Sequence, residues 1–338
     1  GYMYQERLSW YQEIESARNS RLIVYVTGDR RNLETQIHPE VLDLFATHLD
    51  TFGIVPKISL FLYTRGGDTL GAWSIANLIQ QYCDEFEVLI PAKAHSAGTL
   101  IALGAQSIIM TRQATLGPID PSVNTPLNPE IPGAPPQTRM PVSVEAINGF
   151  IELAKQIGIE ESGDLARVME LLTTRVHPLV LGQVYRTRAQ IRRLGERLLA
   201  RHTSDSEKME KILDFLCSES GSHDYTIYHE EAREYLGLKV GLPNDDLYEA
   251  MKSVYNSIAK ELQLNEPYNA PVYLGQQKQA GYSFTRALVE SVSGGYHRFV
   301  SEGVLNKHQL VNQQNGIVQD AIQDNRTFEG WQYEPVQA

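Results

Sequence analysis

Two short segments place residues suited to acyl-transfer chemistry directly after apolar, strand-like runs. Arg65-Gly66-Gly67-Asp68 follows the run at 57–63, and a serine-containing segment at 93–99 (KAHSAGT) follows the run at 87–91. A glycine pair lets the chain turn sharply and leaves a backbone N–H facing open space. At the start of a helix, a serine hydroxyl is exposed and the next amide points the same way.

These two segments predict an oxyanion hole above a nucleophile. One β–α–β unit separates them, so adjacent parallel strands would bring the Gly67 and Ala97 amides together over the hydroxyl of Ser96. Each segment also has a simpler interpretation: a tight turn for the glycines and a helix N-cap for Ser96. The combination favours attack on a carbonyl group.

The spacing of apolar residues predicts the elements that position these residues. Strands are expected at 21–27, 57–63, 87–91 and 107–110, and helices at 4–19, 37–49, 70–82 and 97–105. This alternation predicts an α/β fold with a parallel sheet and β–turn–α repeats.

The composition of the chain changes at a polar stretch near residue 202. We expect a first domain at 1–201, a small helical module of winged-helix-like pattern at 202–265, and a C-terminal extension at 266–338. The extension contains two strand-like runs, at 284–290 and 296–302. The C-terminal appendage as a whole is predicted to be mainly helical.

Composition excludes several classes of protein. Across 338 residues, 30 Lys and Arg stand against 41 Asp and Glu, a net charge of -11 that disfavours nucleic-acid and anionic-membrane binding. The 2 cysteines exclude a disulfide scaffold and a multi-cysteine metal site, and they suit the cytoplasm. No membrane span and no signal peptide are found. No cofactor is expected because nucleotide-binding motifs are missing, and no metal because His223 and His229 lack ligand companions at useful spacing.

Residues 60–123 resemble a known family. LFLYTRGGDTLGAWSIANLI, SAGTLIALGA and LGPIDP are typical of the serine dehydrogenase proteinases, which are ClpP/crotonase-fold serine peptidases related to signal peptide peptidase A; the resemblance continues in RVHPLVLG at 175–182. It implies a ClpP/crotonase-like sheet, Ser96 as nucleophile, and Gly67 and Ala97 as oxyanion donors. It also implies a peptide or unfolded-protein substrate and a homo-oligomer.

The resemblance leaves the general base open. Asp120 stands where ClpP-type peptidases have their histidine. The signal peptide peptidase branch would have its lysine base near residues 143–146, but no lysine occurs between Lys93 and Lys155. His177 oriented by Asp120 is one hypothesis, since a histidine base needs a carboxylate. His95, next to the serine, is another, and both lysines are further candidates. In a simpler interpretation His177 and Asp120 only cap a helix and a turn.

Three other functions compete with a peptidase. The chain is interpreted alternatively as a non-catalytic oligomeric scaffold, with residues 207–338 as a partner-binding module, or as a latent protease that a partner activates. The missing standard base favours both. An acyl-CoA enzyme of the crotonase type shares the pair of oxyanion amides, but its chemistry relies on Glu or Asp bases rather than on a serine.

Overall fold

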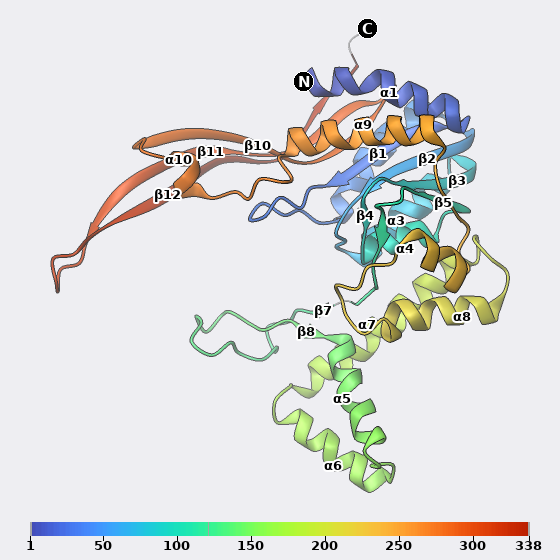
Figure 1. Cartoon of the computed structure of the whole chain (residues 1–338). Helices are drawn as coiled ribbons and strands as arrows, with labels where there is room; N and C mark the ends of the chain where they lie inside the picture. The colour runs from blue at the N-terminus through green and yellow to red at the C-terminus, as the bar shows by residue number, and fades with distance from the viewer. Residues whose placement is uncertain (1, 121, 337–338) are drawn as a thin grey trace. The chain divides into compact units, whose positions relative to one another are not determined.

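The computed structural model describes residues 2–120 and 122–336, and the chain divides into two compact units (Figure 1). The first unit is Gly1–Leu116 with Tyr228–Ala338, and the second is Gly117–Ile227. The boundaries expected at residues 201 and 265 differ from this division. The polar stretch near 202 lies inside the second unit, between two of its helices.

An eight-stranded sheet forms the centre of the described part of the first unit, in the order β12-β11-β10-β1-β2-β3-β5-β9. Its strands are β1 (Arg21–Thr27), β2 (Val55–Tyr63), β3 (Cys83–Ile90), β5 (Ser107–Met110), β9 (Val240–Gly241), β10 (Gln279–Ser291), β11 (Gly295–Val311) and β12 (Val318–Glu334). From β1 to β9 neighbouring strands are parallel. The predicted α/β class with parallel strands is therefore confirmed.

Helices cover both faces of the parallel strands, and α10 (Ala270–Leu274) packs instead on β10 and β11. The other helical elements of the described part of this unit are α1 (Tyr2–Arg18), η1 (Pro39–Val41), α2 (Leu42–Phe52), α3 (Thr69–Gln80), α4 (Ala97–Leu103), η3 (Glu231–Tyr235) and α9 (Asp245–Leu262). On one face, Tyr11 of α1 and Met251 of α9 pack with Val24 of β1 in a buried cluster. On the other, Tyr25 of β1 meets the ring of Phe45 edge-on. Burial on both faces explains the continuous apolar run of β1.

The prediction of a mainly helical C-terminal appendage is wrong. Strands β10, β11 and β12 are antiparallel and join the sheet beside β1, and we call these three strands the C-terminal arm (Figure 1). The strand-like runs at 284–290 and 296–302 lie inside β10 and β11. Along β12 every residue is exposed or half-buried, so its sequence lacks the alternation that identifies a strand with one buried face. Hydrogen bonding in the hairpin makes it a strand.

The second unit is mainly helical. It contains β7 (Ser122–Val123), β8 (Val142–Ser143), α5 (Val144–Gln156), α6 (Ser162–Thr173), α7 (Pro178–Leu199), α8 (Ser206–Asp214) and the π-helical turn η2 (Phe215–Glu219). A small valine-rich core joins β7 and β8 to α5 and α7. Of the helices expected in the module at 202–265, α8 lies in this unit and α9 in the first.

Within residues 2–120 and 122–336, no helix combines the length and the apolar character that crossing a bilayer requires. The same residues contain no group of three or more His, Cys, Asp or Glu side chains arranged to hold a metal ion.

Candidate active site

The first glycine turn lies at the carboxyl end of β2, where the chain leaves the sheet. Thr64 continues the strand pairing, because its N–H donates to Lys93 O at 3.1 Å. The hydroxyl of Thr64 then accepts from Gly66 N at 3.0 Å, which folds the chain back on itself. Gly66 and Gly67 have φ of 116° and 144°, a region that favours glycine. The sequence therefore needs both glycines for this turn.

Ile37 determines the direction of the Gly67 amide. Ile37 N donates to Gly66 O at 2.8 Å, and Asp68 N donates to Ile37 O at 2.9 Å. Polar backbone groups alternate in direction along an extended chain, so the Gly67 N–H between them points away from Ile37. Among the residues that the structure describes, this amide has no hydrogen-bond partner. It is therefore free to bind an oxyanion.

Ser96 occupies a strained turn between β4 (Lys93–Ala94) and α4. Its φ of 53° and ψ of -117° are values that glycine adopts readily and other residues rarely. A serine held on such a sharp strand-to-helix turn has its hydroxyl pushed out of the helix, as in the nucleophile elbow of hydrolases. Its side chain is half-buried and caps no amide of α4, so the N-cap interpretation of Ser96 fails.

The two turns are in direct contact. A Cβ atom on Gly66 would lie 2.7 Å from Cβ of Ser96 and 3.0 Å from the carbonyl oxygen of His95. Only glycine fits there. The structure thus brings together the serine and the glycine turn, as expected for adjacent parallel strands.

Ala97 supplies the second free amide of the turn. Gly98 N donates to His95 O at 2.8 Å and Thr99 N to Ser96 O at 2.9 Å. By contrast, Ala97 N has no partner within the described ranges, 2–120 and 122–336. Helix α4 is only 7 residues long, so the argument rests on the orientation of this amide rather than on a helix dipole.

His95 is directed towards a neighbouring strand. Its Nε2 lies 2.7 Å from Oγ1 of Thr115, which belongs to β6 (Thr115–Leu116), paired in parallel with β4. The Ser96 hydroxyl, in turn, makes no hydrogen bond to any described residue of the first unit. The structure places His95 beside the nucleophile in the chain but does not join the two side chains.

Lys93 is held in an ion pair. Its Nζ lies 2.8 Å from Oδ2 of Asp29, a residue just beyond β1, and the hydroxyl of Tyr63 donates to the other oxygen of Asp29 at 2.7 Å. Burial and the nearby Asp29 charge raise the pKa of Tyr63, which keeps this hydroxyl protonated. The ion pair thus holds the Lys93 ammonium group on Asp29.

The remaining base candidates lie in the second unit. Oδ1 of Asp120 accepts from the Ser143 hydroxyl at 3.3 Å. His177 is exposed and is the N-cap of α7, where its Nδ1 accepts from Leu179 N at 3.1 Å. Among the described residues no hydrogen bond joins His177 to Asp120. Lys155 is exposed and pairs with Glu152 at 3.6 Å.

Sequence reasoning missed Ile37 and Asp29, which hold the site. Asp29 could have been suspected, because a carboxylate directly after a strand lies at the edge where the two turns meet. No motif in the neighbouring sequence identifies Ile37, because its role depends on a β-bridge to Gly67, which is distant in the chain. Among other nucleophiles, Cys217 is excluded, because burial raises the pKa of its thiol to about 12.

The comparison with protein families now agrees with this geometry. Residues 51–134 match the family described as ClpP-like SDH-type serine proteinase. The matched segment contains Gly67, Ser96, Ala97 and Asp120. The resemblance expected from sequence is therefore confirmed.

Two relatives come from Methanocaldococcus jannaschii, and both are uncharacterized. The protein MJ0137 is 29% identical over 243 residues, which cover 69% of this chain and 73% of the relative. The protein MJ1495 is 31% identical over 130 residues, which cover 36% of this chain and 44% of the relative. Neither relative has an assigned activity that could be compared.

The chain is also similar, at low identity, to several solved structures. A mutant of the 1510-N membrane-bound stomatin-specific protease is 19% identical, with a TM-score of 0.39, over 69% of this chain and 85% of that chain. A second mutant of that protease, in complex with a substrate peptide, is 20% identical, with a TM-score of 0.36, over 67% and 77%. ClpP1 from Listeria monocytogenes is 14% identical, with a TM-score of 0.36, over 69% and 98%.

Proposed function

We propose that this chain is a ClpP-like serine peptidase with Ser96 as its nucleophile. The single observation that carries the proposal is the strained backbone of Ser96, with φ of 53° and ψ of -117°, held against the Gly66–Gly67 turn. Strain of this kind costs about 1–3 kcal/mol and persists where the surrounding structure enforces it, most often at functional sites.

The proposed reaction is acyl transfer to the serine. Oγ of Ser96 attacks the carbonyl carbon of a peptide bond while a general base accepts the hydroxyl proton. The carbonyl oxygen becomes an oxyanion, and the amides of Gly67 and Ala97 donate to it. The tetrahedral intermediate then collapses, the protonated amine leaves, and water hydrolyses the resulting ester by the same steps. Loss of one such donor typically reduces the rate by about 100-fold to 1,000-fold.

We propose a histidine as the general base, either His95 or His177. His95 lies in the same turn as Ser96, and a rotation of its ring away from Thr115 would free Nε2. His177 with Asp120 is the alternative, in which the carboxylate would orient the ring. Either group would need a change from the contacts it makes in this structure, and substrate binding commonly tightens such geometry.

Hydrolysis of a fluorescently labelled, unfolded protein tests this proposal. We expect activity in the wild type and none in Ser96→Ala. Of His95→Ala and His177→Ala, only the variant that lacks the base should lose activity to a similar degree, and Asp120→Asn should follow His177→Ala if those residues act together. Lys155→Ala, on an exposed helix, is the matched control and should retain activity. Equal activity in wild type and Ser96→Ala would refute the proposal.

A latent or non-catalytic role is the second candidate function. The observation in its favour is that the Ser96 hydroxyl has no base bonded to it in the described part of its unit. A partner bound through the C-terminal arm would complete the site in the latent form, whereas a scaffold would stay silent with every partner. Reaction of Ser96 with an acylating probe, measured without any substrate, separates a formed nucleophile from a scaffold.

Self-association is part of the proposal, with peptide or unfolded protein entering between subunits. The second unit supports it, because α6 has no buried residue and apolar side chains on α5, α6 and α7 are strongly exposed. Ile157, Leu171 and Leu179 are 70%, 65% and 68% exposed. Such surfaces are usually covered in an assembly. Analytical ultracentrifugation should find an oligomer in the wild type and a smaller species in Ile157→Glu/Leu171→Glu.

A further inference from the structure

Arg286 lies where β10 changes its neighbours. A β-bulge between Thr285 and Ala287 interrupts the pairing of β10 with β11. On one side of the bulge, Ala287–Ser291 pairs with β1 of the parallel sheet; on the other, β10 pairs only with β11. The bulge therefore lies where the arm leaves β1, which is the neighbour of the strand β2 that leads to the Gly66–Gly67 turn.

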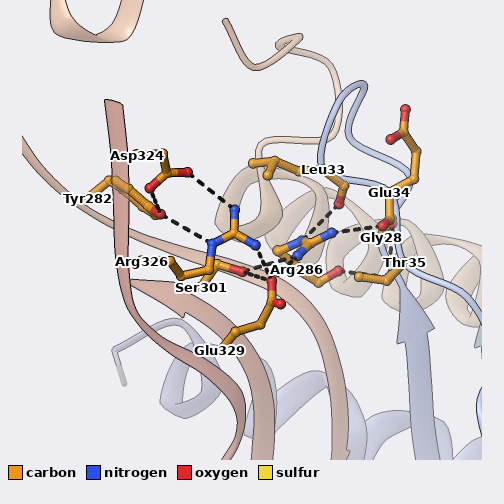
Figure 2. Close-up of polar contacts among 10 residues, drawn as sticks. All are labelled: Gly28, Leu33, Glu34, Thr35, Tyr282, Arg286, Ser301, Asp324, Arg326 and Glu329. Carbon is orange, nitrogen blue, oxygen red and sulfur yellow. Dashed lines mark hydrogen bonds and ion pairs between the residues drawn. The ribbon is translucent and has the colours of Figure 1, made fainter. Parts of the chain in front are cut away.

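The Arg286 guanidinium bridges the arm and the loop that follows β1 (Figure 2). Nε donates to Leu33 O at 3.1 Å and Nη2 donates to Glu34 O at 2.9 Å. In the other direction, Nη1 donates to Oε1 of Glu329 on β12 at 2.7 Å. The Arg286 side chain is only 14% exposed, although its bonds to Glu34 O and Glu329 lie at the surface. A planar guanidinium is suited to hold two carbonyls and a carboxylate at once.

The backbone of the same loop closes on the bulge. Gly28 N donates to Arg286 O at 2.9 Å, and Thr35 N donates to Gly28 O at 2.8 Å. A Cβ atom on Gly28 would overlap the carbonyl oxygen of Arg286, so only glycine permits this approach. The loop at 28–35 is thus fastened to β10 by backbone and side chain together (Figure 2).

This loop leads directly to Ile37, which orients the Gly67 amide. Ile37 follows Thr35 by two residues and bonds Gly66 O and Asp68 N on either side of Gly67. The contact is tight, because a Cβ atom on Gly67 would lie 2.5 Å from Ile37 O. A displacement of the loop would therefore move Ile37 and rotate the amide.

We propose that Arg286 is a positioning residue for the Gly67 amide, and that it couples the C-terminal arm to the oxyanion hole. The proposal rests on the proposed function, because it assumes that Gly67 N–H binds the oxyanion. With Arg286 in place, Leu33 and Glu34 are fixed, Ile37 stays on Gly67, and the amide keeps its direction. Binding of any partner that moves the arm would act on the rate through the same contacts.

Two variants isolate this role. Arg286→Ala removes the bonds to Leu33 and Glu34 together with the ion pair to Glu329. Arg326→Ala is the matched control, because Nη1 of Arg326 bonds the same Oε1 of Glu329 at 2.7 Å, while its described bonds do not reach the loop at 28–35. Arg286→Lys keeps the charge but cannot hold both carbonyls, so it should fall between Arg286→Ala and wild type.

Two measurements report the effect of replacing Arg286 on the oxyanion hole. Hydrogen exchange followed by mass spectrometry reports the Ile37 and Asp68 amides without any chemistry at Ser96. The second measurement is the rate of Ser96 phosphonylation by a fluorophosphonate, separated into the maximal rate at saturation and the probe concentration at half-maximum. In Arg286→Ala we expect faster exchange at both amides and a maximal rate about 10-fold to 100-fold lower, with the half-maximal concentration little changed. Arg326→Ala should match wild type in both.

The outcomes separate this inference from the proposed function. Unchanged exchange at Ile37 and Asp68 in Arg286→Ala, or an unchanged maximal rate despite faster exchange, would overturn the coupling. An equal loss in Arg326→Ala would assign the effect to the arm's ion pairs instead. If wild type itself is not labelled, the proposed function fails, and the exchange data still decide whether Arg286 holds Ile37. If Arg286→Ala does not fold, Arg286→Lys carries the same comparison.

Discussion

Ser96 combines a reactive side chain with a backbone conformation that serine adopts at a cost. The Gly66–Gly67 turn and the following helix hold it there, because the two turns touch and α4 is completely buried. The result is a serine on a strained turn, and the amides of Gly67 and Ala97 in the two touching turns have no partners among the described residues. The backbone conformation and the side-chain chemistry therefore both favour Ser96 as the nucleophile.

Replacing Ser96 tests whether its backbone is strained. Ser96→Gly should be more stable to urea than Ser96→Ala by about 1 kcal/mol, because glycine accepts this φ and ψ whereas alanine keeps the strain. The net gain is limited because glycine also has more freedom in the unfolded chain. Neither variant should react with a serine-directed probe.

A matched pair elsewhere in the chain gives the control. Gly182 lies in α7 with open space around its Cβ position, so Gly182→Ala should stabilise the protein slightly, by about 0.5–1 kcal/mol. If Ser96→Gly is less stable than Ser96→Ala, the Ser96 backbone is not strained in solution, and the observation that carries the proposed function is lost.

At the scale of elements, the parallel core could be predicted and the arm could not. Strands β1 and β5 begin and end at the residues expected, because both are buried on two faces and read as short apolar runs. In β12, by contrast, Asp320, Asn325 and Arg326 break any apolar pattern. Its partner is β11, with a register set by the hairpin rather than by burial.

Helix α1 shows a further contact that sequence patterns do not reveal. Arg7 is fully buried, and its guanidinium donates to Glu290 of β10 and to Ser257 and Glu261 of α9. These partners lie far along the chain, so only the fold brings them together. The hydroxyl of Tyr11 also donates to Glu290. This network fastens the N-terminal helix to the sheet.

Removing Arg7 should therefore destabilise the first unit strongly. In Arg7→Met the Glu290 carboxylate remains buried without its cation, which typically costs about 3–5 kcal/mol. Urea unfolding followed by circular dichroism measures the loss. The control is Arg233→Ala, which breaks the exposed pair to Glu234 and should cost less than about 1 kcal/mol. Similar losses of unfolding free energy in both variants would show that the buried network stabilises the protein no more than an exposed ion pair does.

At the scale of the whole molecule, two buried histidines link α2 to the arm. Nε2 of His48 lies 3.0 Å from Nδ1 of His297, and Nδ1 of His48 lies 2.5 Å from the Ser291 hydroxyl. Burial lowers the pKa of His48 to about 3 and that of His297 to about 4. In the unfolded chain both would titrate near their ordinary value of 6.5. The folded protein therefore keeps both rings neutral.

Acid should weaken the fold for this reason. Below about pH 6.5 the two histidines bind protons in the unfolded chain but stay neutral in the folded protein. The free energy of unfolding is therefore at its full value above that pH and falls as the pH drops. Between about pH 6.5 and 5.5 we expect a loss of about 1 kcal/mol for each histidine. His48→Asn should reduce this slope in urea unfolding. His308→Gln, on the exposed part of β11, should leave it unchanged.

The candidate site was predictable where chemistry follows a strand end and unpredictable where it depends on long-range contacts. Gly67, Ser96 and Ala97 could be named because glycine and serine types occur at consecutive strand ends of a parallel sheet. Ile37 and Arg286 could not, because each acts through backbone bonds to residues distant in sequence. For the base, the chain carries no histidine or lysine at the positions that the resemblance to ClpP-type and signal peptide peptidases would predict.

The most direct test of the account is to label the protein with a fluorophosphonate and to map the modified residue by peptide mass spectrometry. Oγ of Ser96 would form a bond to phosphorus as fluoride leaves. We predict one modified residue, Ser96, with labelling abolished in Ser96→Ala and in heat-unfolded wild type. Labelling at another residue, or none at Ser96 in the folded protein alone or mixed with unfolded polypeptide, would contradict the claim that Ser96 is an activated nucleophile.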